Sequence, residues 1–584
     1  MKMTHDLPTR RVTVLAQDPS IHDLNGLPLF TTVLVPNDRL LPGPRSSRIH
    51  VMDIDANSGR MIAPAPDPST DFTQPVREGG VRSRKAAARR LLRDPHFHAQ
   101  NVHAIAASTL MEFESALGRH VSWGFRSGSH ELKIAPHAFL DLNAFYSRED
   151  EALVFGYYPK TDKSRAFVFT CLCFDVIVHE TTHAILDGLR SEYLRPASAD
   201  QAAFHEAFSD IIAILSVFRS PEIVEHGLGG RTPDRTIAKA LFEPEALRQT
   251  FLFGLANEVG EALSNRSLGS IHGNPLRRSV EIKPDPELYA SEAETAGPHA
   301  FGEILVAAVL NTFIDIWSRR VEPLDPVKAE RVDRERAIEE GAKAAQHLLR
   351  MCIRALDYLP STNVTFRDYA SALITADFET APNDGQYGYR QALCNSFAAY
   401  GIAEAGATPD NLRWAAPDNP DTIVYGFDTH TQMQWDRESL FRFLWENMRV
   451  LGLSEDAYTR VVSVRPVVRH GHNGCVVRET VVEYTQQINL FASGLDRYGL
   501  SRTDGMPSNL YVELFGGGTL IFDDYGGLKY HIRIGVTGEG QQKRLDTLWH
   551  NGHYEQRASH ERRFAETHLG RMTQTRPSRN GDAW

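Results

Sequence analysis

The amino-acid sequence predicts an α+β protein, because strand-like and helix-like patterns occupy separate stretches of the chain. Runs of β-branched residues separated by Gly and Pro occur before residue 56 and again after residue 458. Between residues 101 and 403, apolar residues instead recur every three or four positions, which is typical of helices packed in a core. With 584 residues, the chain is long enough for about two to four domains.

Composition limits the class of protein. The hydrophobic content of 42% and charged content of 23% are typical of a globular protein. A net charge of −11 without long acidic runs argues against nucleic acid as a main partner. We identify no apolar run of the roughly 18 residues that a membrane span needs, and no apolar segment of a signal peptide at the N-terminus. We therefore expect no membrane partner and a cytoplasmic location, with the five scattered cysteines as mostly buried free thiols.

The first part of the chain is predicted to hold a small module and a linker. Residues 1–75 are expected to form a small β-rich N-terminal module. Four prolines in residues 56–80 indicate a linker. The basic segment RSRKAAARRLLR at residues 82–93 favours a solvated helix face over a binding site for an acidic partner. The sequence then predicts one helix and two strands, at residues 101–117, 121–126 and 131–134.

The most informative stretch begins with FDVIVHETTHAILDGLR at Phe174. On a helix, His179 and His183 lie on one face because they are four residues apart. Two imidazoles at this spacing can bind one zinc ion, with Zn–N distances of about 2.0–2.1 Å. Glu180 stands beside the first histidine, where it can act as the general base toward a metal-bound water. The pattern predicts a zinc site with an open coordination position.

The segment DQAAFHEAFSD, which follows closely, supplies the remaining groups of this site. Its apolar residues recur at helical spacing over residues 204–218. Glu206 and Asp210 are four apart and therefore share one face of that helix. We assign Glu206 as the third metal ligand. Asp210 is expected to hold the outer nitrogen of a histidine ligand.

These two segments resemble the zinc helix and the glutamate helix of the thermolysin-like metallopeptidases, the gluzincin group. LNAFYSREDEALVFGYYP (Leu142–Pro159) is similar to the substrate-edge strand of that family, and AGPHAFGEILVAAV (Ala296–Val309) to the segment that carries its transition-state histidine. The resemblance covers about residues 101–402. It implies a catalytic region with a β-rich upper part at 80–190, which includes the zinc helix, and a mainly α-helical lower part at 191–405.

The resemblance also implies roles for residues outside the metal ligands. His299 matches the transition-state histidine, and Glu294 is placed to orient it. Asn143 and Ala144 match the edge that accepts an extended peptide as an added strand. Tyr193 is a further candidate for an oxyanion donor.

One position departs from the family pattern. The buried arginine that contacts the substrate carbonyl in that family is matched here by Gly269. Arg266 and Arg277 are both alternatives for its role, and the sequence does not decide between them. The departure concerns how a peptide substrate is anchored and which side chains are preferred, and it does not concern the metal chemistry. In the same lower part, helices are predicted at 245–263, 302–317, 330–359, 365–376 and 389–403.

The C-terminal part lies outside the resemblance. Residues 407–422 are predicted to be a linker, and residues 423–556 a C-terminal α+β module with a helix at 437–451. The module is expected to contain paired strands around a turn at 470–474, then a three-stranded β-meander with turns at 516–518 and 523–527. Residues 557–584 are expected to be a disordered tail. The two flanking modules are expected to bind or restrain a protein partner, or to narrow the cleft.

The sequence thus predicts a zinc-dependent endopeptidase with one Zn²⁺ per chain and a protein or peptide substrate. Two alternatives stay open, a zinc hydrolase of a non-peptide amide and a non-catalytic binding protein on the same fold. Calcium is not expected. Asp175 matches one calcium ligand of the family, but only Glu222 and Glu225 follow in the segment after the glutamate helix, and calcium needs about six to eight oxygen ligands.

Overall fold

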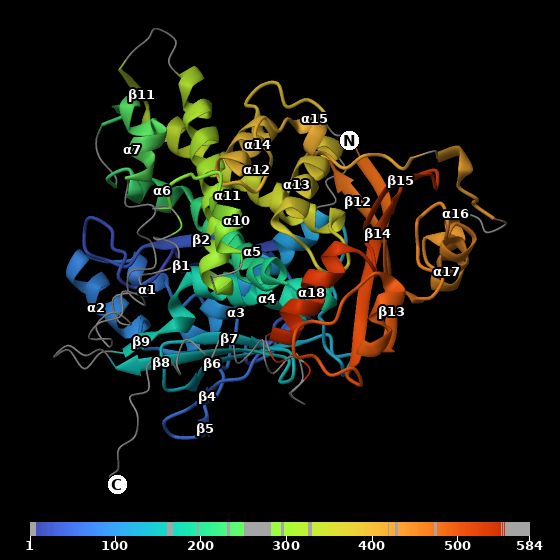
Figure 1. Cartoon of the computed structure of the whole chain (residues 1–584). Helices are drawn as coiled ribbons and strands as arrows, with labels where there is room; N and C mark the ends of the chain where they lie inside the picture. Colours follow the sequence, from blue (N-terminus) through green and yellow to red (C-terminus); the bar gives the residue numbers. More distant parts are fainter. Residues whose placement is uncertain are drawn as a thin grey trace.

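The chain folds into a helical centre flanked by two β-sheets, which confirms the α+β class (Figure 1). A computed structural model describes residues 8–159, 167–195, 198–230, 234–249, 279, 282–293, 297–324, 330–418, 420–426, 430–471, 476–550, 552 and 554. The N-terminal sheet lies below the helices in Figure 1, and the C-terminal sheet lies to their right.

The N-terminal sheet has an order that places a short strand at its edge. The order is β3-β6-β8-β7, and a further strand, β9, also pairs with β8. β3, β6 and β8 run parallel, whereas β7 and β9 run antiparallel to β8. The strands span Ile49–Val51 (β3), Leu132–Phe139 (β6), Ala144–Ser147 (β7), Ala152–Pro159 (β8) and Phe167–Phe169 (β9). β7 is therefore an edge strand among the described residues.

Residues 8–75 share their core with the rest of the protein. Strands β1 (Thr9–Leu15) and β2 (Phe30–Pro36) pair with each other and pack on helix α3 (Pro95–Leu117). Their inward residues, such as Val14 and Val35, belong to the same hydrophobic cluster as the central helices. β3 lies within the expected N-terminal module but pairs with β6 of the next unit. The alternating pattern predicted strands here. It could not predict which strand β3 pairs with, because the partner lies about 80 residues further along the chain.

Short elements connect these parts. They are β4 (Ile54–Asp55), β5 (Arg60–Met61), α1 (Gln74–Arg77), α2 (Val81–Leu91), η1 (Thr170–Leu172), η2 (Ser191–Leu194), α6 (Pro221–Gly227), β10 (Thr236–Ala238), η3 (Lys239–Phe242), α7 (Pro244–Arg248), α10 (Leu288–Glu292), η5 (Glu322–Leu324), β11 (Arg331–Asp333), η6 (Leu356–Tyr358), α15 (Pro409–Leu412) and η7 (Pro420–Thr422). The expected helix at 245–263 is described only as far as residue 249. Gly269, Arg266 and Arg277 lie outside the described residues.

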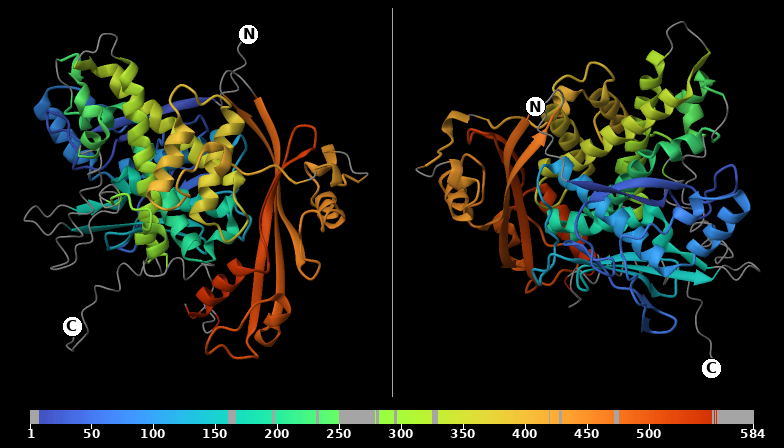
Figure 2. Two further views of the ribbon diagram at one scale, coloured as in Figure 1. Left: turned by 45° about the horizontal axis from the view of Figure 1, so that its top comes forward. Right: turned by 180° about the vertical axis from the view of Figure 1, so that it is seen from behind.

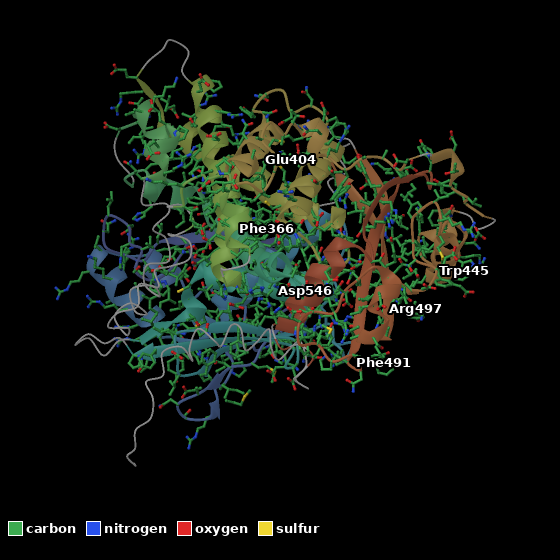
Figure 3. All side chains as sticks on the ribbon, in the orientation of Figure 1. Phe366, Glu404, Trp445, Phe491, Arg497 and Asp546 are labelled. Carbon is green, nitrogen blue, oxygen red and sulfur yellow. The ribbon has the colours of Figure 1, made fainter. Side chains whose placement is uncertain are left out.

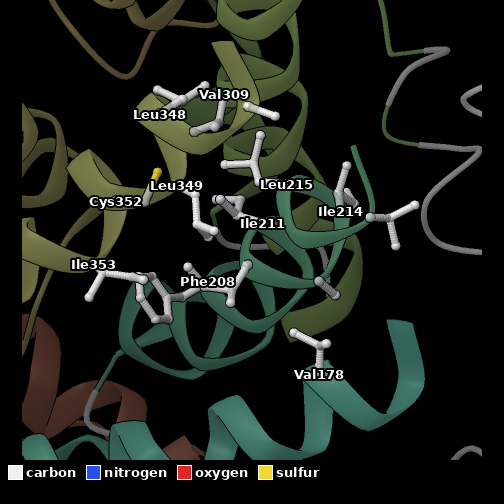
Figure 4. Packing of buried hydrophobic residues seen from close by; sticks show 14 of the residues in the cluster. Val178, Phe208, Ile211, Ile214, Leu215, Val309, Leu348, Leu349, Cys352 and Ile353 are labelled. Carbon is white, nitrogen blue, oxygen red and sulfur yellow. The ribbon is translucent and has the colours of Figure 1, made fainter. Parts of the chain in front are cut away.

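The helical centre is built around helix α5 (Ala199–Phe218), which packs against α4 (Phe174–Leu189), α11 (Pro298–Val321) and α12 (Arg334–Ala355). Figure 4 shows side chains of these four helices meeting around Phe208, Ile211 and Leu215 of α5. Because α5 is apolar on nearly all sides, it is stable only when other helices surround it. Two further helices, α13 (Phe366–Thr380) and α14 (Tyr389–Ala399), complete the centre.

Among the described residues, α5 and α11 are long and apolar enough to cross a membrane. The expectation that no segment of the chain reaches this length and composition was therefore wrong. Both helices are mostly buried within the helical centre. Buried core helices pass the same test of length and composition.

The C-terminal sheet consists of four antiparallel strands in sequential order (Figure 2). They are β12 (Tyr458–His470), β13 (Val476–Phe491), β14 (Tyr511–Phe522) and β15 (Leu528–Ile534). Helices α16 (His430–Met433) and α17 (Arg437–Glu446) lie on the side away from the helical centre, where Trp445 is exposed (Figure 3). The 3-10 helix η9 (Ala492–Tyr498) follows β13, and α18 (Glu539–His550) follows the last strand. Residues 472–474 of the turn expected at 470–474 lie outside the described residues, and so does the tail expected at 557–584.

The turn predicted at residues 516–518 is not present. Three consecutive glycines lie within the continuous strand β14, whereas the turn predicted at 523–527 is confirmed. The glycines allow close backbone packing: a Cβ atom on Gly517 would lie 2.3 Å from the carbonyl oxygen of Tyr484 and 2.5 Å from Oγ of Ser361. Gly517 also has φ +147°, which L-residues with a side chain rarely adopt. Gly517 therefore serves the contact between the sheet and the helical centre, whereas Gly516 and Gly518 lie close to the backbone of residues 532–536.

Charged side chains fill much of that contact. Arg465 of β12 donates to the backbone carbonyls of Leu189 (3.1 Å) and Gly188 (3.4 Å), at the C-terminal end of α4. Arg190, which follows α4, donates to the carbonyl of Leu356 and to Oγ1 of Thr519 in β14 (3.2 Å). A cation at a helix C-terminus satisfies carbonyls that lack partners within the helix. The C-terminal sheet thus stabilises the end of the helix that carries HExxH.

Candidate metal centre

Helix α4 places its two motif histidines side by side. His179 Nε2 and His183 Nε2 are 2.9 Å apart, and the ring planes are nearly perpendicular. The helix is buried over most of its length, and the hydroxyls of Thr181 and Thr182 donate to the carbonyls of Ile177 and Val178. These bonds satisfy the polar side chains that the motif carries into the core. The predicted spacing therefore brings both imidazoles to one point.

Helix α5 brings a carboxylate to the same point. The side chain of Ser198 accepts a hydrogen bond from the backbone N–H of Gln201 and begins this helix. Glu206, two turns later, lies 3.7 Å from His179 Nε2 and 3.8 Å from His183 Nε2 through its two oxygens. One nitrogen of each histidine and one oxygen of Glu206 all lie within 4.8 Å of one another. The three residues predicted as metal ligands therefore converge.

The outer nitrogens of both histidines have partners on α5. Asp210 lies 2.8 Å from His179 Nδ1, in the position predicted from the sequence. His183 Nδ1 lies 2.7 Å from His205 Nδ1 and 3.1 Å from Oγ of Ser209. The sequence reasoning missed His205 and Ser209. Their spacing could have indicated them. His205 and Ser209 are four residues apart, like Glu206 and Asp210, and therefore also share one face of the helix.

Three carboxylates make the centre electronegative. Burial lowers the pKa of His179, but Asp210, Glu206 and Glu180 together raise it well above the usual value. Glu180 itself is 4% exposed. A site with this surplus of negative charge attracts a cation.

The centre opens toward His179 and His299. The side chains of these histidines are 16% and 25% exposed, whereas Glu206 is 5% exposed and His183 is fully buried. His299 stands near the start of α11, with Nδ1 3.2 Å from an oxygen of Glu206. One turn later, a Cβ on Gly302 would lie 3.0 Å from the carbonyl oxygen of Ala203, so a glycine lets α11 approach α5 closely here. The structure thus brings His299 to the centre.

The other predicted residues divide into three groups. Tyr193 is buried, and its hydroxyl donates to the carbonyl of Pro360 at 2.6 Å, so the structure does not present it as an oxyanion donor. Burial raises the pKa of this hydroxyl. Glu294 lies outside the described residues. Asn143 and Ala144 lie at the start of edge strand β7, where the Asn143 side chain accepts from the backbone N–H of Ala144 at 2.9 Å.

Strand β7 is joined directly to α4. The hydroxyl of Tyr146 donates to Asp187 of α4 at 2.6 Å, and Arg148 forms an ion pair with the same carboxylate. Asp187 is fully buried. The edge strand is therefore held beside the helix that carries His179 and His183.

Asp175, in the first turn of α4, is buried close to a second carboxylate. Burial and the neighbouring Asp18 raise the pKa of Asp175 to about 7. An unfolded Asp has a pKa of about 3.9. The folded protein therefore holds a proton that the unfolded chain releases, and its stability falls as the pH rises from about 4 to about 7.

We expect Asp175→Asn to remove this pH dependence. At pH 8 the variant should be more stable than the wild type by up to about 4 kcal/mol, and the two should converge near pH 4. Urea unfolding at both pH values measures the difference.

A calcium ion at Asp175 would instead favour the carboxylate. A fall in thermal midpoint after EGTA treatment with zinc buffered back, restored by calcium alone, would contradict both this prediction and the expectation that calcium is not bound.

Comparison with known proteins adds no family assignment. No model of a protein family matches the chain, and no curated protein matches it either. The functional argument therefore rests on the motif and on the geometry of α4, α5 and α11.

Proposed function

We propose that the protein is a zinc-dependent metallopeptidase with a thermolysin-like catalytic region. The observation that carries the proposal is the convergence of His179, His183 and Glu206 from two packed helices, with Glu180 next to the first ligand. Two imidazoles and one carboxylate are a ligand set of catalytic zinc sites, which keep a fourth position open. Their outer-nitrogen partners on α5 support this assignment, because such partners orient metal-binding histidines.

The protein residues divide the chemistry among themselves. A bound zinc ion would supply Lewis acidity, which polarises a carbonyl and lowers the pKa of a water. Glu180 accepts the proton of the attacking water and returns it to the leaving amine. His299, on the exposed side of the centre, donates a hydrogen bond to the carbonyl oxygen as negative charge develops there.

The edge strand supports the proposed substrate class. β7 has one strand partner, β8, among the described residues, and it is fixed to α4 through Tyr146 and Asp187. An extended peptide can add to such an edge by main-chain hydrogen bonds, which recognise the backbone of any sequence. This favours a protein or peptide substrate over a small non-peptide amide.

Asp210→Asn should weaken zinc binding without abolishing it. Asp210 contacts the outer nitrogen of His179, and loss of such a partner typically lowers metal affinity by about 10–100-fold. Competition with a zinc chelator measures the affinity. Asp234→Asn, at an exposed position, is the matched control and should bind zinc like the wild type. Equal zinc affinity of Asp210→Asn and the control would contradict the assigned role of Asp210.

The function is tested by identifying new protein N-termini in a cell lysate. Wild-type protein should generate cleavage sites that Glu180→Gln does not generate. A parallel assay on small amides tests the alternative substrate class. Cleavage of amides alone would replace the peptidase proposal with a non-peptide amidohydrolase, and no hydrolysis with zinc bound would favour a binding protein.

A further inference from the structure

A second group of metal-binding residue types lies between α3, β6 and η1. His98 of α3 and His137 of β6 approach each other with Nδ1 of His98 2.8 Å from Nε2 of His137. Cys171 of η1 completes the group, and one atom of each residue lies within 4.8 Å of the others. The three residues are 1%, 5% and 0% exposed. None of them belongs to the candidate metal centre.

The outer nitrogens of both histidines have acceptors as partners. His137 Nδ1 lies 2.9 Å from both oxygens of buried Asp53, and His98 Nε2 lies 3.2 Å from the carbonyl oxygen of Leu92. A carbonyl oxygen and a carboxylate accept hydrogen bonds and cannot donate them. Both outer nitrogens therefore carry protons. In neutral rings, the two inner nitrogens then point lone pairs at each other.

Two lone pairs at 2.8 Å require a positive charge between them, either a proton or a metal ion. A proton would be shared by the two histidines alone, whereas a metal ion would also be coordinated by the sulfur of Cys171. We propose that His98, His137 and Cys171 bind a second metal ion, of the zinc type. Imidazole and thiolate are ligands that zinc prefers. The two positive charges of the ion balance the thiolate and the carboxylate of Asp53, and binding releases the thiol proton.

The geometry requires only a small adjustment. Tetrahedral coordination with Zn–N distances of about 2.0–2.1 Å places two ligand nitrogens about 3.3 Å apart, so the rings would separate by about half an ångström. Asp53 and the Leu92 carbonyl then hold the rings in orientation, as partners of metal-binding histidines do. Among the described residues, the group supplies three ligands and leaves a fourth coordination position open.

The surroundings indicate a structural role for this ion. Phe169 packs against both rings, with centroids 4.6 Å from His98 and 5.4 Å from His137, and Tyr157 packs against His137 at 5.7 Å. These rings keep the group away from solvent and substrate. Cys171 stands three residues before α4, so a bound ion would join α3 and β6 to the start of that helix.

Metal content and cobalt spectroscopy test the proposal on the full chain. Among the described residues, the candidate metal centre has no sulfur ligand, so a thiolate-to-cobalt charge-transfer band in the near ultraviolet is the signature of the second site. We expect two zinc ions per wild-type chain and this band after cobalt replacement. Cys171→Ala should lose one zinc ion and the band. Cys352→Ala, which removes a buried thiol elsewhere, is the matched control and should keep both.

The outcomes separate this proposal from the proposed function. One zinc ion per chain that His183→Ala removes, with no cobalt–thiolate band, overturns the second site and means that a proton joins His98 and His137. One ion with a band that persists in His183→Ala supports the second site and contradicts the zinc peptidase. A band that Cys352→Ala removes and Cys171→Ala keeps also overturns the assignment.

Discussion

Glu180→Gln is expected to lower the rate of peptide hydrolysis by about 10²–10⁴-fold while the zinc content stays unchanged. Glutamine has nearly the same shape as glutamate, but its amide cannot accept the proton of the attacking water. Glu180 is adjacent to the ligand His179 without belonging to the converging ligand set. Loss of the carboxylate should therefore reduce kcat and leave the metal in place. Zinc analysis and steady-state kinetics on one preparation measure both quantities.

A control distinguishes this effect from a general loss of structure. Glu335→Gln makes the same chemical change at an exposed position of α12, and it should retain full activity. His183→Ala should lose the zinc ion of the candidate metal centre together with the activity, because it removes a fully buried proposed ligand. Ordinary turnover by Glu180→Gln would show that another group serves as the base, and the mechanism proposed above would be wrong.

The convergence of the candidate ligands could be predicted from the sequence because helical spacing is local. His179 and His183, and likewise Glu206 and Asp210, are four residues apart, so a helix alone brings each pair to one face. The meeting of the two pairs required packing of α4 on α5, which the apolar pattern of both helices favours. Tyr193 shows the limit: its hydroxyl contacts Pro360, a partner 167 residues away that no spacing rule reveals.

The sheets were less predictable than the helices for a related reason. The sequence pattern identifies β3 as a strand, but its neighbour β6 begins about 80 residues later. The three glycines of β14 have the composition of a turn, yet they lie within a strand, and Gly517 allows contact with Ser361 of the helical centre. His98, His137 and Cys171 are likewise separated by 39 and 34 positions, so only the fold brings them together.

The contact between the C-terminal sheet and the helical centre depends on a buried ionic network. Asp357 lies 2.6 Å from two nitrogens of Arg119 and also pairs with Arg469 of β12. Arg469 reaches Glu479 of β13 at 2.6 Å, and the Tyr358 hydroxyl donates to the same carboxylate at 2.9 Å. A chain that ended at residue 405 would expose Asp357 and leave it without Arg469. Activity of such a fragment would therefore combine any loss of restraint with a loss of stability, and a point variant is the better probe of the contact itself.

Asp357→Asn should destabilise the protein by about 3–5 kcal/mol at pH 7, because two buried arginines lose their shared counter-charge. Asp315→Asn, in an exposed ion pair with Arg319, should cost less than about 1 kcal/mol.

Burial alone would raise the pKa of Asp357, but Arg119 and Arg469 hold it well below the usual range. The stabilisation is therefore present above about pH 4 and is lost as the pH falls through the lower folded-state pKa. The difference in urea midpoint between wild type and Asp357→Asn should accordingly shrink in acid. A difference that is small at pH 7, or constant down to low pH, would mean that the network does not hold the C-terminal sheet against the helical centre.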